Sequence, residues 1–221
     1  MLSDNIPQSN STQNNLTQLE AGKSITKVIE HIIMLLPHFI SNAKSKGIKP
    51  EKGLNHLFVR IMDCHELFQF MHEDIEEPAK GKSPAIDIGV YTRGDISARF
   101  FAIEAKRLDT SIGNYSQRRK EYVVNDNQGG IERFKKEIHA KELLCAGMLG
   151  YLQSDDFNTW YERINDYINE EISGCTIGVV WNRNDLLQIE KINMVYATYV
   201  SKHLRESGSE IDLYHIWINL K

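Results

Sequence analysis

Three charged residues fall on two neighbouring strand-like runs near the middle of the chain. Asp87 lies in the run 84–91, whereas Glu104 and Lys106 lie in the run 99–106, and a turn-forming stretch joins the two. Because side chains alternate between the two faces of a strand, Glu104 and Lys106 share one face. If the runs form a hairpin, the Asp87 carboxyl group converges with them opposite an apolar face. Buried charges are costly unless they pair with each other or with a metal ion.

These residue types suit a metal site that cleaves phosphodiester bonds. Mg²⁺ prefers oxygen ligands, keeps several waters, and takes one or two carboxylates together with phosphate oxygens. Asp87 and Glu104 would supply the carboxylates, and the backbone carbonyl of Ala105 a third oxygen. Hairpin pairing sets Asp87 across from either Ala102 or Glu104. Lys106 would lie beside the metal-bound water, able to orient or deprotonate it and to offset charge on the phosphate. Mn²⁺ is expected to substitute for Mg²⁺.

The same residues resemble the signature of the PD-(D/E)xK nuclease superfamily, whose fold is found in many restriction endonucleases. The matching residues are Pro84 with Asp87, followed by Glu104-Ala105-Lys106. Two residues separate Pro84 from Asp87, whereas the name of the signature has them adjacent. The resemblance covers residues 51 to 220 and implies a divalent metal cofactor and a DNA substrate.

The motif also has a purely structural interpretation. An acid two residues before a lysine is weak evidence alone, although Glu104 is the only Asp or Glu in the chain with Lys two positions later. The alternative is a surface hairpin that carries an ordinary cross-strand ion pair. The two interpretations differ in whether the charged groups are gathered in a pocket or surrounded by solvent.

The resemblance further implies an acid on a helix that precedes the hairpin. Apolar residues at helical spacing follow Pro50, which is well placed at the start of a helix. Glu51 is the first candidate for this acid, and Asp63 is the second. The alternative for Glu51 is a first-turn acid that the helix dipole favours.

Basic residues gather after the proposed metal strand, although the net charge of the chain is -4. Affinity for nucleic acid depends on the phosphates that are neutralised locally, so a basic segment can serve as a backbone-contacting flap. A solvated loop with a few charges is the alternative. Between positions 106 and 120 the basic residues, against one acid at Asp109, are Lys106, Arg107, Arg118, Arg119 and Lys120.

A second phosphate-binding candidate lies further along the chain. Gly129 and Gly130 precede an expected helix, where free backbone N–H groups can bind phosphate, and Arg133 and Lys136 follow about one turn further in. Glycine before a helix also occurs for reasons of packing alone.

The periodicity of the sequence predicts one α/β domain. Residues 1–15 are rich in Asn, Ser and Gln and predict a disordered tail, and residues 16–221 predict a single domain with a mixed β-sheet flanked by helices, which is the restriction endonuclease-like arrangement. Strands are expected at 67–71, in the hairpin, at 176–181 and at 211–218. Helices are expected at 16–45 with a bend at Pro37, after Pro50, at 131–139, at 143–152, from Asp155 or Asp156 to Gly174, and at 192–204.

Several other classes of protein are disfavoured. No apolar run is long enough for a membrane span and no signal peptide is evident, so we expect a cytoplasmic protein without a membrane partner. The three cysteines lack the paired spacing of a disulfide framework or a zinc site. No nucleotide-phosphate loop and no Ser-His-Asp pattern is evident.

These observations predict a Mg²⁺-dependent endonuclease that acts on DNA, and the resemblance suggests a role in bacterial restriction or phage defence, with a partner protein from such a system. Cleavage of both strands of a duplex would favour a homodimer. One alternative is a DNA-binding or assembly subunit that keeps the fold without catalysis, which the acidic net charge supports. The other alternative is an RNA nuclease. The target sequence, strand preference and oligomeric state are not encoded in any recognisable pattern.

Overall fold

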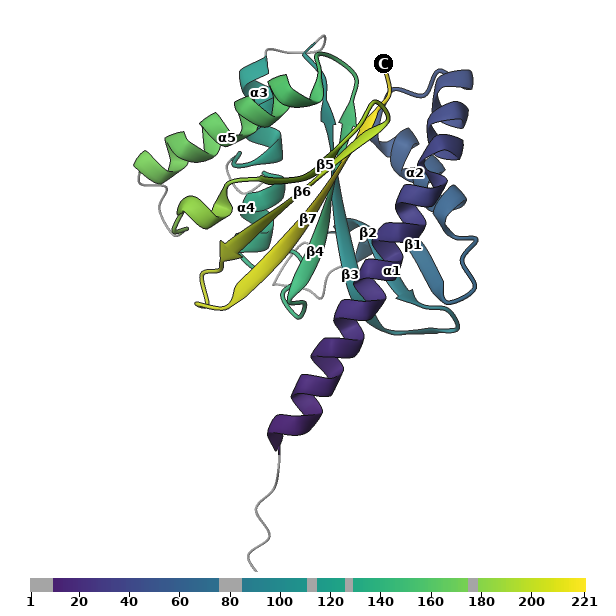
Figure 1. Cartoon of the computed structure of the whole chain (residues 1–221), viewed down its shortest axis with the longest axis vertical. Coiled ribbons are helices and arrows are strands. Elements are labelled where there is room, and N and C mark those ends of the chain that lie inside the picture. The colour runs from purple at the N-terminus through teal and green to yellow at the C-terminus, as the bar shows by residue number, and fades with distance from the viewer. Residues whose placement is uncertain (1–9, 76–84, 111–114, 126–128, 175–178) are drawn as a thin grey trace, which may run out of the picture.

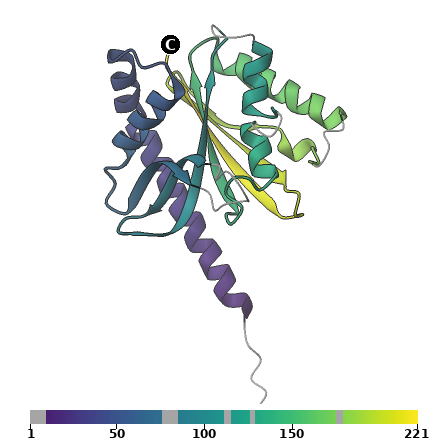
Figure 2. The same ribbon diagram turned by 180° about the vertical axis from the view of Figure 1, so that it is seen from behind.

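The computed structural model of the chain describes residues 10–75, 85–110, 115–125, 129–174 and 179–221. Within these residues a seven-stranded sheet lies between two layers of helices, which Figure 1 shows edge-on. Helices α1 and α2 lie on one side of the sheet, and α3, α4 and α5 lie on the other side, as the view from behind in Figure 2 also shows. The predicted α/β class with a mixed sheet flanked by helices is therefore confirmed.

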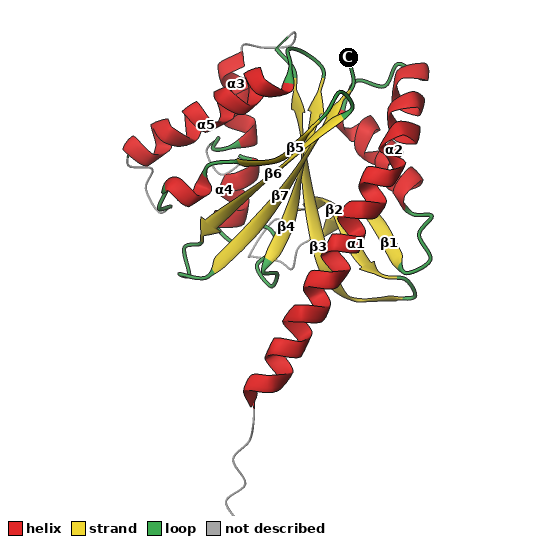
Figure 3. Ribbon diagram, in the orientation of Figure 1, coloured by secondary structure: helices red, strands yellow, loops and turns green. Residues whose placement is uncertain are grey.

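Figure 3 separates the helices from the strands. The helices are α1 (Asn10–Ser45), α2 (Glu51–Met62), α3 (Tyr115–Tyr122), α4 (Gly130–Lys135), α5 (Phe157–Ser173) and the short 3-10 helix η1 (Arg183–Asp185). The strands are β1 (Phe68–Ile75), β2 (Ala85–Thr92), β3 (Asp95–Leu108), β4 (Cys145–Leu152), β5 (Gln188–Ile192), β6 (Tyr196–Leu204) and β7 (Glu210–Asn219).

The strand order across the sheet is β1-β2-β3-β4-β7-β6-β5. Strands β1, β2 and β3 form an antiparallel meander, β4 is parallel to both β3 and β7, and β6 and β5 complete the sheet in antiparallel pairing. Parallel neighbours require a crossover connection, and α3 and α4 provide it between β3 and β4. The chain is thereby returned over the sheet beside β3, the strand that carries Glu104 and Lys106.

Helix α1 is longer than its sequence pattern predicts. It begins at Asn10, so six residues of the expected tail are helical, and it continues through Pro37 without ending there. A helix extends readily once its first turn has formed, because each further residue adds one hydrogen bond. Its first turns project beyond the sheet (Figure 1). No helix in the described part of the chain has both the length and the apolar character needed to span a membrane.

Strand β4 occupies the segment 143–152 that periodicity assigned to a helix, so that expectation was wrong. Residues 146–152 are all buried because the strand has neighbours on both edges and helices over both faces. Such a strand reads as a continuous apolar run that periodicity cannot distinguish from a buried helix. Gly147 and Gly150 therefore do not share a helix face. A Cβ atom at Gly150 would overlap the indole ring of Trp217 on β7, which explains the glycine.

The C-terminal third contains two further corrections. The expected helix at 192–204 falls almost entirely on strand β6, in which four consecutive residues, 196–199, are buried. That burial on both faces removes the alternation that identifies a half-exposed strand. The strand expected at 176–181 is also wrong where it can be judged, because residues 179–181 have no regular structure, and residues 176–178 lie outside the described part.

The remaining elements agree with the sequence pattern. Helix α2 starts after Pro50, β1 and β7 lie where strands were expected, and α5 begins at its cap Asp156 and ends at Gly174. Helix α4 ends at Lys135, four residues earlier than expected.

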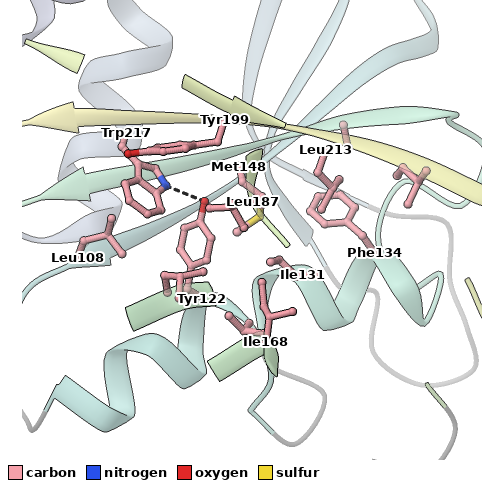
Figure 4. Packing of buried hydrophobic residues seen from close by; sticks show 14 of the residues in the cluster. Leu108, Tyr122, Ile131, Phe134, Met148, Ile168, Leu187, Tyr199, Leu213 and Trp217 are labelled. Atoms are coloured by element: carbon pink, nitrogen blue, oxygen red, sulfur yellow. Dashed lines mark hydrogen bonds between the residues drawn. The ribbon is translucent and has the colours of Figure 1, made fainter. Parts of the chain in front are cut away.

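Two hydrophobic cores hold the layers together, one on each side of the sheet. Figure 4 shows the core beneath α3, α4 and α5, in which Trp217 of β7 donates a hydrogen bond to the Tyr122 hydroxyl of α3. The other core is built from the apolar stripes of α1 and α2. Both faces of β3 are therefore covered, and charged side chains on this strand must be satisfied inside the protein.

Candidate metal centre

The hairpin register brings Asp87 and Glu104 together. Strand β2 pairs with β3 so that Ile88 faces Ile103, which places Asp87 beside Glu104 rather than Ala102. The backbone N–H of Ala105 donates to Asp87 Oδ2 over 2.8 Å. The carbonyl of Ala105 as a metal ligand stays a prediction, and Pro84 lies outside the described residues.

Glu104 is the centre of this cluster, and it is only 1% exposed. Its Oε1 atom accepts hydrogen bonds from Lys106 Nζ at 2.5 Å and from Arg133 Nη1 at 3.3 Å. Its Oε2 atom is buried and accepts no hydrogen bond within the described structure. An unsatisfied buried carboxylate oxygen is costly and calls for an explanation such as an ion. The burial of Glu104 also argues against the solvent-exposed hairpin.

His139, which no sequence pattern indicated, lies beside both Glu104 and Arg133. Its Nε2 atom lies 3.1 Å from Arg133 Nη1 and 3.5 Å from Glu104 Oε2. Because a guanidinium group can only donate, His139 Nε2 must be the acceptor and its proton must sit on Nδ1. Burial lowers the pKa of His139 to about 4, which agrees with a neutral ring. His139 therefore cannot donate a hydrogen bond to Glu104 Oε2, and that oxygen remains unsatisfied.

The start of helix α2 brings Glu51 to the site. Its Oε2 atom accepts a hydrogen bond of 3.0 Å from the backbone N–H of Arg107, one residue beyond Lys106. Asp63 lies at the other end of this twelve-residue helix, about 18 Å along the axis, where its carboxylate pairs with Arg93 at 2.7 Å. Of the two acids predicted for this role, Glu51 therefore lies beside the hairpin residues Glu104 and Lys106, whereas Asp63 forms an ion pair with Arg93 at the other end of the helix.

The three carboxylates differ in proton affinity. Burial alone would raise the pKa of Glu104, but the neighbouring charges of Lys106 and Arg133 outweigh burial and lower it. Burial, together with the charge of Glu104, raises the pKa of Asp87 to about 8. Burial also raises the pKa of Glu51. Burial alone would lower the pKa of Lys106, but the charges of Glu104, Asp87 and Glu51 outweigh it and raise the pKa, so the ammonium group stays protonated. A protonated Lys106 can orient water and offset charge, but it cannot accept a proton.

The donor set fits a hard divalent cation. Three carboxylates face two cationic side chains, Lys106 and Arg133, so the fully ionised pocket carries one excess negative charge. In the described part of the chain no three His, Cys, Asp or Glu side chains are grouped closely enough to hold a metal by themselves. Mg²⁺ does not require such a cage, because it retains waters and shares its coordination with one or two carboxylates and substrate phosphate. The unsatisfied Oε2 of Glu104 is the atom that such a cation would satisfy.

The structure describes most of the residues proposed for a basic flap, and it places them in different surroundings. Arg119 pairs with Glu170 at 2.9 Å and lies over the ring of Tyr167, which accounts for it by packing. Arg107 is half-buried and Lys120 is exposed, whereas the side chain of Arg118 lies outside the described part of the structure. Phosphate binding by these three stays a prediction.

The glycines before α4 are explained by close packing. A Cβ atom at Gly129 would lie 2.5 Å from the carbonyl oxygen of Val123, and one at Gly130 would lie 2.6 Å from a methyl group of Met148. The Glu132 N–H already donates to Val123, and Lys136 pairs with Glu132 at 2.8 Å. Arg133 is thus the residue of this segment that reaches the metal centre.

A second buried polar cluster extends along the other half of the sheet. Asp185 Oδ1 accepts from Lys135 Nζ and His203 Nδ1, each at 2.5 Å. Ser201 Oγ lies 2.6 Å from His203 Nε2 and 2.7 Å from His215 Nε2. His215 Nδ1 in turn lies 2.8 Å from the Tyr122 hydroxyl group.

This cluster has the composition of a Ser-His-Asp set, which the sequence did not reveal, but not its accessibility. Ser201 is 4% exposed and is held between two imidazole rings, whereas a nucleophile needs access to substrate. With Asp185 as the final acceptor, the groups form one continuous series of hydrogen bonds. The series begins with the Trp217 N–H, and each group accepts from the one before it and donates to the one after it. We therefore interpret the cluster as a structural hydrogen-bond network.

Comparisons with known proteins give no relative for this chain. No family model matches it, and no curated protein or solved structure reaches a significant match. The geometry around Glu104 is therefore the basis for proposing a function.

Proposed function

We propose that the chain is a Mg²⁺-dependent endonuclease of the restriction endonuclease-like fold that hydrolyses phosphodiester bonds of DNA. One observation carries the proposal: a buried carboxylate, Glu104, leaves one oxygen unsatisfied next to Asp87 and within reach of a protonated lysine. The order of the strands supports it, because an antiparallel meander leads through a helical crossover into a parallel strand. The signature residues fall at the junction of these two patterns.

Each residue has a distinct task in this proposal. Asp87 and Glu104 would hold the cation, which when bound acts as a Lewis acid and lowers the pKa of a coordinated water. The Lys106 ammonium group orients the attacking water and offsets the charge that develops on the phosphate, and the proton of that water passes to solvent or to a phosphate oxygen. Glu51 fixes the backbone at Arg107 and thereby the position of Lys106.

The direct test is plasmid nicking with Mg²⁺, with Mn²⁺ and with EDTA. Glu104→Gln and Lys106→Ala should each reduce the rate at least 10²-fold, because each removes charge stabilisation at the reacting phosphate (about 10²–10³-fold per group). Asp166→Asn, an exposed acid on α5, is the matched control and should leave nicking unchanged. Full activity in the Glu104 or Lys106 variant would remove these residues from the mechanism.

A second candidate function is a catalytically silent DNA-binding or assembly subunit. The observation that favours it is the 2.5 Å ion pair of Lys106 with Glu104, which occupies one oxygen of the proposed metal ligand. Salt-dependent DNA binding without cutting in the presence of Mg²⁺ or Mn²⁺ would favour this candidate. Competition between duplex DNA and RNA substrates would separate a DNA nuclease from an RNA nuclease.

The biological setting remains part of the proposal. A restriction or phage-defence role and a partner protein are proposed from the resemblance alone, and fold does not determine biology. The homodimer is proposed because a duplex has two strands to cleave, and the cytoplasmic location is proposed from the sequence composition. Analytical ultracentrifugation with and without duplex DNA would test the homodimer.

A further inference from the structure

Arg133 differs from Lys106 in how far it reaches out of the pocket. Both side chains contact the Oε1 atom of Glu104, but 26% of the Arg133 side chain is exposed, compared with 12% for Lys106. A guanidinium group carries five N–H donors in a planar fork that matches the geometry of phosphate oxygens. Arg133 is therefore suited to contact both the buried carboxylate and a group outside the pocket.

The charge balance of the pocket indicates what that outer group is. With all three carboxylates ionised, the positive charges of Lys106 and Arg133 leave one negative charge, and a divalent cation converts this to one positive charge. A single phosphodiester group would neutralise it. Without Arg133 the cation-loaded pocket would be neutral and would not attract the substrate phosphate.

The chain after α4 is bent so that His139 returns to Arg133. Glu137 and Ala140 adopt positive φ angles of 54° and 52°, which L-residues seldom do. The backbone N–H groups of Ile138 and His139 both donate to the Arg133 carbonyl, at 2.9 and 3.2 Å. The imidazole is thereby held where its Nε2 atom accepts from Arg133 Nη1.

Resting on the proposed nuclease function, we propose that Arg133 binds a backbone phosphate of the nucleic acid next to the metal centre, and that His139 is the positioning residue that aims its guanidinium group. His139 acts only as a hydrogen-bond acceptor. It contacts the same guanidinium nitrogen as Glu104, and about a quarter of the Arg133 side chain (26%) remains exposed.

The test measures DNA binding separately from cleavage. The affinity for a short duplex is measured against salt concentration in the full-length protein, with Ca²⁺ in place of Mg²⁺. Each lost phosphate contact reduces the slope of log K against log salt by about 0.9. Arg133→Gln should show that reduction. Lys141→Gln, which removes an exposed charge from the turn after α4, is the matched control and should leave the slope unchanged.

The role of His139 is tested with a pair of variants. His139→Leu removes the acceptor and should reduce the slope as Arg133→Gln does, whereas His139→Gln retains an acceptor and should restore most of it. Thermal unfolding monitors the fold of each variant. A merely structural role would lower the stability of both His139 variants without changing the salt slope.

Each outcome separates this inference from the proposed function. An unchanged slope in Arg133→Gln overturns the phosphate contact, and a reduced slope in Arg133→Gln with an unchanged slope in His139→Leu overturns the positioning role. If the wild type binds DNA with Ca²⁺ but does not cut it with Mg²⁺, the proposed catalysis fails while the slopes still decide the roles of Arg133 and His139. A wild type that binds no nucleic acid overturns both.

Discussion

Two aspartates of this protein, the buried Asp185 and the half-buried Asp87, lie in polar clusters that are satisfied to different degrees. Asp185 accepts from Lys135, from His203 and from the backbone N–H of Asn182. Burial alone would raise its pKa, but the His203 hydrogen bond and the Lys135 charge outweigh burial and lower it. Asp87 accepts one backbone hydrogen bond and faces Glu104, and burial raises its pKa to about 8.

The difference is the one expected between a cluster that stabilises the fold and a cluster that binds a ligand. In the Asp185 cluster the donors and acceptors match, so ionisation is favoured and nothing further is needed to complete it. In the Asp87 cluster the carboxylates repel one another and Glu104 retains an unsatisfied oxygen. Proteins retain such costly arrangements at sites that bind ligands or catalyse reactions. The comparison therefore supports the proposal that Asp87 and Glu104 bind a cation, and it favours a role in stability for Asp185.

The strongest test of this comparison is Asp87→Asn. We expect a loss of Mg²⁺-dependent nicking of about 10²–10³-fold, because the neutral amide no longer holds the cation. The thermal stability of the metal-free protein should be maintained or should increase, because the repulsion with Glu104 is removed. The measurements are plasmid nicking and thermal unfolding in EDTA. A large loss of metal-free stability would place Asp87 with Asp185 as a structural residue.

Asp185→Asn should give the opposite result. The variant leaves the buried ammonium group of Lys135 without a counter-charge, which typically costs about 3–5 kcal/mol of unfolding free energy. Nicking per folded molecule should stay close to that of the wild type. Urea unfolding with a parallel activity assay on the folded fraction tests both. Wild-type stability in Asp185→Asn would contradict the structural interpretation.

Tyr122→Phe probes the far end of the same network with a smaller expected loss. The change removes the hydroxyl group that accepts from Trp217 Nε1 at 2.9 Å and contacts His215, leaving both without that partner. Leaving a buried polar group unsatisfied costs about 1–3 kcal/mol. Urea unfolding of Tyr122→Phe beside Asp185→Asn gives the comparison. If Tyr122→Phe loses as much unfolding free energy as Asp185→Asn, the charge of Asp185 adds nothing beyond an ordinary hydrogen bond.

The mildest test changes pH and no residue. Folded metal-free protein retains a proton on Asp87 up to about pH 8, whereas the unfolded chain releases it near the ordinary pKa of 3.8. The folded state thus binds more protons between these values, so this group makes stability fall as pH rises through that range. Asp185, with a lowered pKa, contributes stability that is lost only as pH falls below its ordinary range.

Added Mg²⁺ should reverse the first of these trends. Cation binding requires Asp87 to be deprotonated, so the increase in Tm with Mg²⁺ should grow between pH 6 and pH 8.5. We expect this change to be smaller than that of the Tyr122 variant, because only one group titrates and water can enter the pocket. Asp87→Asn should abolish the pH dependence of the Mg²⁺ effect. A Mg²⁺ effect on Tm that is the same at both pH values would contradict the assignment.

Parts of the fold followed from local pattern and parts did not. The amphipathic stripe and caps of α5 predicted it from Asp156 to Gly174, because a helix with one buried face has a periodic pattern of its own. Strands β4 and β6 were mistaken for helices. Their burial on both faces depends on which strands lie beside them, and that neighbourhood is not encoded in a short window.

By itself the sequence determined the α/β class, the hairpin and the proximity of Asp87, Glu104 and Lys106 on it, because strand alternation and a short turn are local properties. Only the tertiary structure decided that Glu104 is buried between half-buried partners. It also decided that Glu51 rather than Asp63 joins the cluster, and that Arg133 and His139 lie beside Glu104. Glu51 comes from the start of α2, and Arg133 and His139 come from the segment around α4. His139 lies 35 residues after Glu104 in the sequence. Burial and pairing of charges over such distances are set by the packing of layers, and no local pattern contains that information.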